Sequence, residues 1–347
     1  MNYQNVYINA IGYELPPVVI SSQELEHRLA PLYQTLHMTP GQLQALTGIR
    51  ERRWWHPQTP LSQGAAAAGR KALAAAGVPA EAVGAITYAG VCRELFEPAT
   101  ACRVADQLGI GGDAIIYDTS NACLGVLNGI LDMANRIELG QIRAGLVVSC
   151  ESARELNETT IRRMLNQQDM ALFSRSVATL TGGSGAIAVV LTDNSFNSDQ
   201  AHRLLGGVAM SAPQHHQLCR CGVEEDGQDQ FRQFMNTDAV AVMNHGVDLG
   251  KRTWQEFLKV MNWQENMIDR VVCHQVGSAH QTAILDALGI DRSKDFTTFE
   301  FLGNIGTVSL PITAAIAAER GVLKSGDHTA LLGIGSGLNC MMLGVEW

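Results

Sequence analysis

The sequence predicts an α/β protein made of two similar halves, and two observations point to this fold class. First, short runs of β-branched and other apolar residues alternate with longer stretches of helical periodicity. Second, the order of these elements repeats about 180 residues later. The expected buried strands are 84–89, 114–118, 145–149, 186–192, 270–275, 329–334 and 340–345. The expected helices are 63–75, 100–108, 123–137, 239–261, 279–288 and 311–319.

The repeat centres on two turns. Residues 108–110 and 288–290 both read Leu-Gly-Ile at the end of a helix. Each is followed by an expected strand, 114–118 in the first half and 296–301 in the second. A turn follows each strand. The first turn holds Asn121 and the second holds Asn304. Two such halves packed around a pseudo-twofold axis place the turns opposite each other at the centre of the molecule.

This repeat divides the chain into residues 1–195 and 196–347, and we expect the functional site where the halves meet. The first half carries two insertions that the second lacks. One adds about six residues around 93–97. The other spans 151–180 and is rich in Leu, Met and charged residues. An insertion of this size is typical of a segment that covers a site or an interface.

The composition excludes several classes of function. Of the 347 residues, 46% are hydrophobic and 17% are charged, which favours a large packed core over disorder. The net charge is −9 and the densest basic stretch is only Arg50, Arg52 and Arg53, so we expect no nucleic-acid partner. No apolar run is long enough to span a membrane, and residues 1–12 lack the pattern of a signal peptide. With eight scattered cysteines, these features predict a cytoplasmic protein with free thiols.

Cys123 is the first candidate for a catalytic residue, as a nucleophile. It follows strand 114–118 and a short turn, and it stands at the start of the next helix. There, free backbone N–H groups and the positive end of the helix dipole favour a thiolate. A thiolate attacks a thioester readily, and the acyl-cysteine product is itself a thioester. The alternative is a small buried core cysteine, an interpretation that fits Cys102, Cys150 and Cys340.

Two polar residues stand at corresponding junctions of the second half. His274 lies at the end of the buried strand 270–275, where its ring N–H can donate to a carbonyl oxygen that becomes an enolate. Asn304 lies in the turn opposite Cys123, and its amide is a second donor. Taken singly, His274 is better explained as a satisfied core histidine, and the alternative for Asn304 is simply a turn asparagine. Their joint placement at the junction of the halves predicts thioester chemistry.

Over essentially its whole length the chain resembles the β-ketoacyl-ACP synthase III branch of the thiolase superfamily. The segments that carry the resemblance are 47–53, Asn121-Ala122-Cys123, His274-Gln275, Gly303-Asn304 and 333–337. The resemblance implies the thiolase fold, a duplicated five-layer αβαβα architecture. It also implies that Cys123 is acylated and that His274 and Asn304 polarise the carbonyl of the second substrate. The backbone N–H groups of Cys123 and Ser336 would then bind the oxyanion.

The sequence departs from the synthases that initiate fatty-acid synthesis. Their histidine motif usually reads His-Gln-Ala-Asn, whereas residues 274–277 are His-Gln-Val-Gly. They usually carry a Trp and an Arg that grip the coenzyme A nucleotide just before the Thr-Gly-Ile motif, and residues 42–46 hold neither. Instead, residues 93–100, 218–220 and 332–340 look like the acyl-CoA:acyl-CoA condensing enzymes of bacterial olefin biosynthesis. Those enzymes join two fatty acyl-CoA molecules head to head without decarboxylation.

The two branches need different chemistry. A decarboxylating enzyme obtains its carbanion when malonyl loses carbon dioxide, whereas a non-decarboxylating enzyme needs a base to remove the α-proton of an ordinary acyl thioester. By resemblance to the olefin family, Glu97 is that base and reaches the site from the partner subunit of a homodimer. The alternative is a glutamate at a helix start, before Pro98, that the helix dipole stabilises.

The resemblance therefore implies an acyltransferase that condenses two long-chain acyl-CoA molecules into a 2-alkyl-3-oxoacyl-CoA, the first step of long-chain olefin or ketone biosynthesis. Coenzyme A thioesters are its substrates, no cofactor is expected, and downstream olefin-pathway enzymes would take the product. Segment 151–180 would line tunnels for the alkyl chains. The alternatives are a decarboxylating 3-oxoacyl-ACP synthase III that uses acyl-CoA and malonyl-ACP, and a non-catalytic partner subunit. The intact set of Cys123, His274 and Asn304 argues against the last.

A pair of arginines allows two interpretations, and a group of His and Cys residues predicts no site. Arg50 and Arg53 either contact a coenzyme A phosphate or form the salt-bridged edge of a strand. A group of His and Cys residues lies close together in the sequence, but its spacing matches no structural zinc site, so we expect no metal. The group consists of His215, His216, Cys219 and Cys221.

Overall fold

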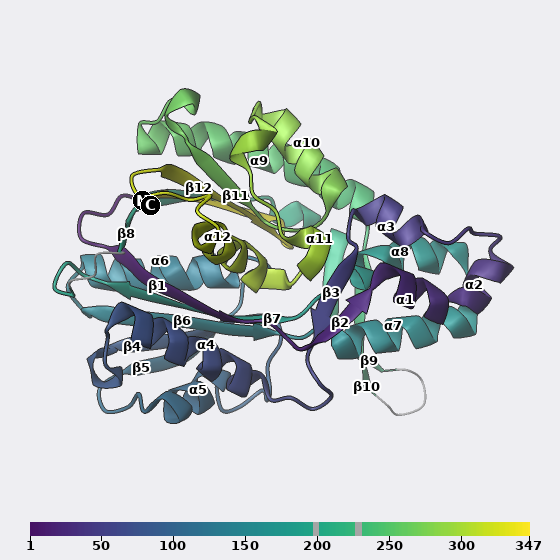
Figure 1. The fold of residues 1–347 in the computed structure, drawn as a ribbon, viewed down its shortest axis with the longest axis horizontal. Helices are drawn as coiled ribbons and strands as arrows, with labels where there is room; N and C mark the ends of the chain where they lie inside the picture. The colour runs from purple at the N-terminus through teal and green to yellow at the C-terminus, as the bar shows by residue number, and fades with distance from the viewer. Residues whose placement is uncertain (197–200, 226–230) are drawn as a thin grey trace.

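The computed structural model describes residues 1–196, 201–225 and 231–347, and its main feature is a mixed sheet of nine strands (Figure 1). The strand order is β11-β12-β13-β8-β1-β7-β6-β4-β5. These strands are β1 (Tyr7–Glu14), β4 (Ala85–Ala89), β5 (Ile115–Thr119), β6 (Ala144–Glu151), β7 (Gly185–Thr192), β8 (His202–Ser211), β11 (Arg270–Cys273), β12 (His328–Gly335) and β13 (Asn339–Glu346). Two small sheets pair β2 (Val18–Ser21) with β3 (Glu51–Trp54) and β9 (Cys219–Glu225) with β10 (Phe231–Thr237).

Strand order and direction repeat in the two halves, which confirms the predicted duplication. In the first half β5, β4 and β6 are parallel, and β6–β7 and β7–β1 are antiparallel. In the second half β11 and β12 are parallel, and β12–β13 and β13–β8 are antiparallel. The halves join where β1 pairs with β8 through Tyr7–Arg203 and Ile8–His202.

Helices form three layers around the two halves of the sheet. The helices are α1 (Ser22–Arg28), α2 (Ala30–Thr35), α3 (Gln42–Thr47), α4 (Leu61–Ala76), α5 (Thr100–Leu108), α6 (Gly125–Glu138), α7 (Arg154–Gln167), α8 (Met170–Leu180), α9 (Ala239–Met261), α10 (Ser278–Leu288), α11 (Phe299–Leu302) and α12 (Ser309–Glu319). Figure 1 shows α6 and α12 between the halves, with α4 and α5 on one outer face and α9 and α10 on the other. The expected five-layer αβαβα architecture is confirmed.

The matching Leu-Gly-Ile sequences end matching helices. α5 ends before Gly109, with φ +72°, and α10 ends before Gly289, with φ +67°. Glycine adopts this left-handed conformation at little cost. The N–H of the isoleucine that follows then bonds to a carbonyl five residues back, at 2.9 Å in both helices. The same local sequence therefore stops the helix in the same way in both halves.

The strand predicted at 296–301 is wrong. Asp295 makes one parallel bridge to β11, at the place where a fifth strand of the second half would lie. The side-chain oxygen of Gln275 then accepts the N–H groups of Thr298, at 2.9 Å, and Phe299, at 3.2 Å. A side chain thus takes the backbone donors that a strand would give to its neighbour, and helix α11 follows.

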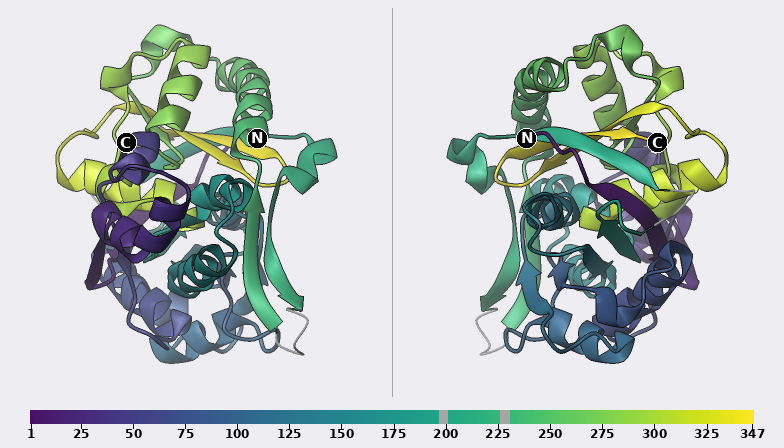
Figure 2. Two further views of the ribbon diagram at one scale, coloured as in Figure 1. Left: turned by 90° about the vertical axis from the view of Figure 1, so that its right-hand side faces the viewer. Right: turned by 90° about the vertical axis from the view of Figure 1, so that its left-hand side faces the viewer.

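The insertion 151–180 folds as the helix pair α7 and α8. These helices pack with α1, α2, α3 and β3 around an apolar cluster of their own, in which Tyr33 and Phe173 meet edge to face at 5.9 Å. The β9–β10 hairpin projects along one side of the molecule, and β10 packs on α7 and α8 (Figure 2). Within the described part of the chain, no helix has both the length and the apolar character needed to cross a membrane.

Candidate active site

Cys123 lies in the turn between β5 and α6. The side chain of Asn121 holds this turn from two sides, because it donates to Asn128 at 3.2 Å and accepts from Asn339 at 2.9 Å. Asn339 begins β13, so the second half of the chain helps to fix the turn. Helix α6 begins at Gly125 and not at Cys123 as predicted, so the thiol precedes the first turn of the helix.

The second-half turn packs against this first turn, as the repeat predicts. The hydroxyl of Thr307 accepts the N–H of Val126 at 2.7 Å. Val126 belongs to the first turn of α6, whose N–H groups have no partner within the helix. A side chain from the second-half turn therefore caps the helix that follows Cys123, and this bond joins the two halves at the site.

Asn304 is fixed at both its backbone and its side chain. Its N–H donates to the carbonyl of Thr181 at 3.0 Å, and its carbonyl accepts from Gly183 at 2.9 Å. These partners directly follow helix α8, so the insertion holds Asn304 in place. The side-chain oxygen of Asn304 accepts the N–H of Gly306 at 3.0 Å. This bond occupies the oxygen and leaves the amide nitrogen as the donor for a ligand.

His274 directly follows β11, and its N–H donates to the carbonyl of Leu332 on β12 at 2.9 Å. Strand β12 runs on to Gly335, where a Cβ would lie 3.3 Å from the backbone nitrogen of Cys123. One strand, β12, therefore contacts both His274 and the backbone of Cys123. Ser336 directly follows this strand. The Nδ1 atom of His274 is buried and has no hydrogen bond among the described residues. The ring lines an apolar cavity of about 40 Å³ beside α9 and α10.

Burial sets the protonation states of the thiol and the imidazole. It raises the pKa of Cys123 to about 12, and the nearby Cys219 and Glu151 add to the rise. It lowers the pKa of His274 to about 4, and His280 adds to the fall. The thiol is thus protonated and the imidazole neutral at pH 7. The predicted resting thiolate is wrong, because the cost of burying a charge exceeds the effect of the helix dipole.

The desolvated ring of His274 makes stability depend on pH. Its pKa of about 4 lies below the ordinary 6.5, so between these values the unfolded chain binds a proton that the folded chain does not. We expect the free energy of unfolding to fall as the pH is lowered from 6.5 to 4, and to fall less in His274→Asn. Urea unfolding at a series of pH values measures both slopes, with the exposed His56→Asn as the control. Equal slopes in all three proteins would contradict this account.

Glu97 belongs to a different loop from the other three candidates. It lies in the segment 90–99 between β4 and α5, where it is exposed and forms no hydrogen bond or ion pair with any described residue. Beside it, Phe96 is 100% exposed and Leu95 is 51% exposed. An acid next to two exposed apolar side chains is typical of a segment that contacts another surface.

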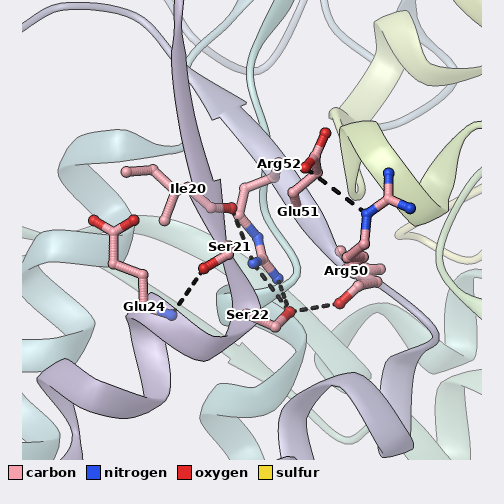
Figure 3. A network of polar contacts seen from close by, with 8 residues as sticks. Ile20, Ser21, Ser22, Glu24, Arg50, Glu51 and Arg52 are labelled. Atoms are coloured by element: carbon pink, nitrogen blue, oxygen red, sulfur yellow. Dashed lines mark hydrogen bonds and ion pairs between the residues drawn. The ribbon is translucent and has the colours of Figure 1, made fainter.

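The two arginines predicted as coenzyme A contacts have different surroundings. The side chain of Arg50 is 64% exposed and lies 3.8 Å from Glu51 (Figure 3). Arg53 donates to a backbone carbonyl at 3.1 Å and belongs to the edge of the β2–β3 sheet. Between them, the buried Arg52 donates to the hydroxyl of Ser22 through both terminal nitrogens at 3.1 Å. Of the two candidates, Arg50 is the one whose guanidinium remains largely in solvent.

The group of His and Cys residues near 215–221 does not form a metal site in the described part of the chain. No three His, Cys, Asp or Glu side chains there are placed to hold a metal ion. His215 instead stacks on His245, with ring centroids 3.8 Å apart. Cys219 and Cys221 lie on β9, and Cys219 contacts Thr237 of β10 at 3.5 Å.

Two residues that position the site are not predicted from the sequence. Gln275 donates to the carbonyl of Cys273 at 2.7 Å and accepts from Thr298, so it joins the strand before His274 to the segment before the Asn304 turn. Glu151 is buried at the end of β6, although the sequence pattern counts it only as the first residue of the insertion. The sequence feature that could have identified Glu151 is an acid at the carboxyl end of an otherwise apolar strand.

Comparisons with known proteins agree with this fold. Residues 258–347 match the family model described as 3-oxoacyl-(acyl-carrier-protein) synthase III C terminal. Over the full length of both chains, the protein is 56% identical to an acyl-CoA:acyl-CoA alkyltransferase of Shewanella oneidensis and 36% identical to one of Xanthomonas campestris. The crystal structure of Xanthomonas campestris OleA with bound cerulenin has a TM-score of 0.93 at 36% identity, covering 100% of this chain and 98% of that chain. A cysteine-to-serine variant of that protein with bound lauric acid and lauroyl-CoA also has a TM-score of 0.93, covering 99% and 100%.

The fold and the arrangement of the site define a condensing enzyme of the thiolase superfamily, an acyltransferase. The full-length identities are more specific than the fold. The chain belongs to the acyl-CoA:acyl-CoA alkyltransferase (OleA) family. The resemblance to the condensing enzymes of olefin biosynthesis is thereby confirmed.

Proposed function

We propose that the protein joins two long-chain acyl-CoA molecules head to head, without loss of carbon dioxide, to give a 2-alkyl-3-oxoacyl-CoA. The full-length identity to two acyl-CoA:acyl-CoA alkyltransferases carries this proposal. The lauroyl-CoA bound to a variant of Xanthomonas campestris OleA supports a fatty acyl-CoA thioester as the substrate. The product, a β-keto thioester made in the cytoplasm, would pass to enzymes of the olefin pathway.

Cys123 accepts the first acyl group. Its sulfur attacks the thioester carbonyl, a new carbon–sulfur bond forms, and the bond to coenzyme A breaks. Because the thiol is protonated at rest, its proton is lost during the attack and leaves with coenzyme A as the free thiol. The backbone N–H groups of Cys123 and Ser336 bind the oxyanion of the tetrahedral intermediate. Arg50, whose side chain is 64% exposed, contacts a phosphate of coenzyme A.

The second acyl-CoA supplies the carbon nucleophile. The carboxylate of Glu97 removes a proton from its α-carbon. The enolate oxygen then accepts hydrogen bonds from the neutral ring of His274 and the amide of Asn304. The α-carbon attacks the acyl-cysteine carbonyl, the carbon–carbon bond forms and the carbon–sulfur bond breaks. The proton that Glu97 removed then passes to the sulfur of Cys123, which restores both groups.

A homodimer brings Glu97 to the reaction centre. Within one chain this carboxylate is exposed, and the apolar Leu95 and Phe96 beside it are exposed as well. Strand β5 forms one edge of the nine-stranded sheet, and its first residue, Ile115, is 43% exposed. Apolar side chains along an unpaired edge are typical of a surface that meets another chain. In such a dimer Glu97 enters the site of the partner subunit.

The product made from one acyl-CoA tests this proposal. Purified protein given myristoyl-CoA alone will form the β-keto thioester. Hydrolysis of this thioester releases coenzyme A and a β-keto acid, which loses carbon dioxide to give a ketone with one carbon fewer than two myristoyl chains. Mass spectrometry identifies this ketone directly. Turnover that appears only after malonyl-ACP is added would contradict head-to-head condensation and favour the decarboxylating synthase III reaction.

A further inference from the structure

Glu151 is a buried acid that the steps above do not use. It ends β6, is 5% exposed, and forms no ion pair with a Lys, Arg or His of the described chain. Burial raises the pKa of its carboxyl group above the ordinary value. Burying an acid away from any cation is costly unless its oxygens are hydrogen-bonded. The groups that bind this carboxylate therefore indicate what it does.

Both oxygens of Glu151 bind the start of the loop that carries Glu97. Oε1 accepts the N–H of Val91 at 2.9 Å, and Oε2 accepts the N–H of Cys92 at 3.2 Å. The carboxylate comes this close because the preceding residue is Gly90, where a Cβ would lie 3.1 Å from Oε1. A carboxylate accepts through two oxygens, whereas an amide accepts through only one.

The same carboxyl group also lies against the turn that holds Asn304. A Cβ on Gly306 would lie 3.4 Å from Cγ of Glu151 and 3.5 Å from its Cδ. The N–H of Gly306 is the group that fixes the side chain of Asn304. One side chain therefore fills the space between the start of the Glu97 loop and the turn that carries an enolate donor.

We propose that Glu151 is a positioning residue that holds the start of the 90–99 loop against the Asn304 turn and so sets where Glu97 is presented. The kinetic part of this proposal rests on the proposed condensation, whereas the anchoring of the loop does not. Only four residues separate Cys92 from Glu97, so a released loop start displaces the base. Misplacing a reacting group by about 1 Å costs on the order of 10²-fold in rate.

The first test separates the two half-reactions. Glu151→Gln keeps the size of the side chain but turns an NH₂ group toward one of the two N–H donors. We expect condensation of myristoyl-CoA to fall about 10²-fold. Acylation of Cys123 does not use Glu97 and will not fall, because loss of the Glu151 charge lowers the pKa of that thiol. Glu151→Asp keeps both oxygens and will recover part of the condensation. Glu155→Gln removes an exposed acid four residues along and will leave both steps unchanged.

Hydrogen exchange tests the anchor independently of the reaction. We expect the amides of Val91 and Cys92 to exchange faster in Glu151→Gln than in wild type or in Glu155→Gln. Unchanged exchange, or an equal loss of acylation and condensation, would overturn the proposal. If the wild type makes no ketone from myristoyl-CoA, the proposed condensation fails, and the exchange rates still decide whether Glu151 anchors the loop.

Discussion

Cys123→Ala will form no acyl-enzyme with myristoyl-CoA, and condensation will fall by at least about 10⁴-fold. Alanine leaves the turn in place, because the contacts that hold it belong to Asn121 and Thr307. It removes only the sulfur to which the first acyl group is bonded. Intact-protein mass spectrometry measures the result directly, as the mass of one myristoyl group on the wild type and none on the variant.

The matched control for this variant is Cys102→Ala. Cys102 on α5 is exposed, so the buried core position expected for it from the sequence is wrong. Its loss will leave both acylation and condensation unchanged. An acyl group found on Cys123→Ala would contradict the assignment. It would point to Cys219, a partly exposed thiol close enough to raise the pKa of Cys123.

Most of the strands that the sequence predicts best are buried on both faces, and β5 at the sheet edge is the exception. The seven predicted strands that formed end within two residues of their expected limits, and α5 and α9 have their expected bounds. A continuous apolar run between glycines is a strong local signal. Strand β1 carries Asn9 and Gly12 within it, and its pattern is correspondingly weak. The junction of the halves at β1 and β8 is therefore not predicted, although the repeat itself is.

The sequence predicts the positions of the site residues, because these depend on where strands end. It does not predict properties that depend on tertiary contacts. The turns of Cys123 and Asn304 follow from the repeat, and the bond between Val126 and Thr307 brings them together. The protonation state of Cys123 depends on burial and on Glu151, which approaches from another strand. No pattern along the chain shows this burial or this neighbour. For that reason the position of Cys123 before a helix leads to the prediction of a thiolate, whereas the thiol is protonated at rest.

Glu97→Ala will still form the acyl-enzyme on Cys123 but will release almost no condensation product. Removing a positioned general base costs about 10²- to 10⁴-fold in rate, and the first half-reaction needs no α-proton transfer. Glu97→Gln will behave in the same way, because an amide does not take the proton. Acyl-enzyme mass and ketone yield, measured in the same samples, separate the two steps. The exposed Glu81→Gln, another acid of the first half, is the control and will retain both.

Mixed dimers decide whether Glu97 acts across the interface. A dimer of Cys123→Ala with Glu97→Ala has no complete site if each chain uses its own glutamate. If the glutamate enters the partner's site, the chain that keeps Cys123 receives an intact Glu97 from the other, and one of the two sites is complete. Random pairing of the two chains then restores about a quarter of wild-type activity, because half of the dimers are mixed. Two inactive parents and an inactive mixture would contradict the trans arrangement, and condensation retained in Glu97→Ala alone would remove this residue as the base.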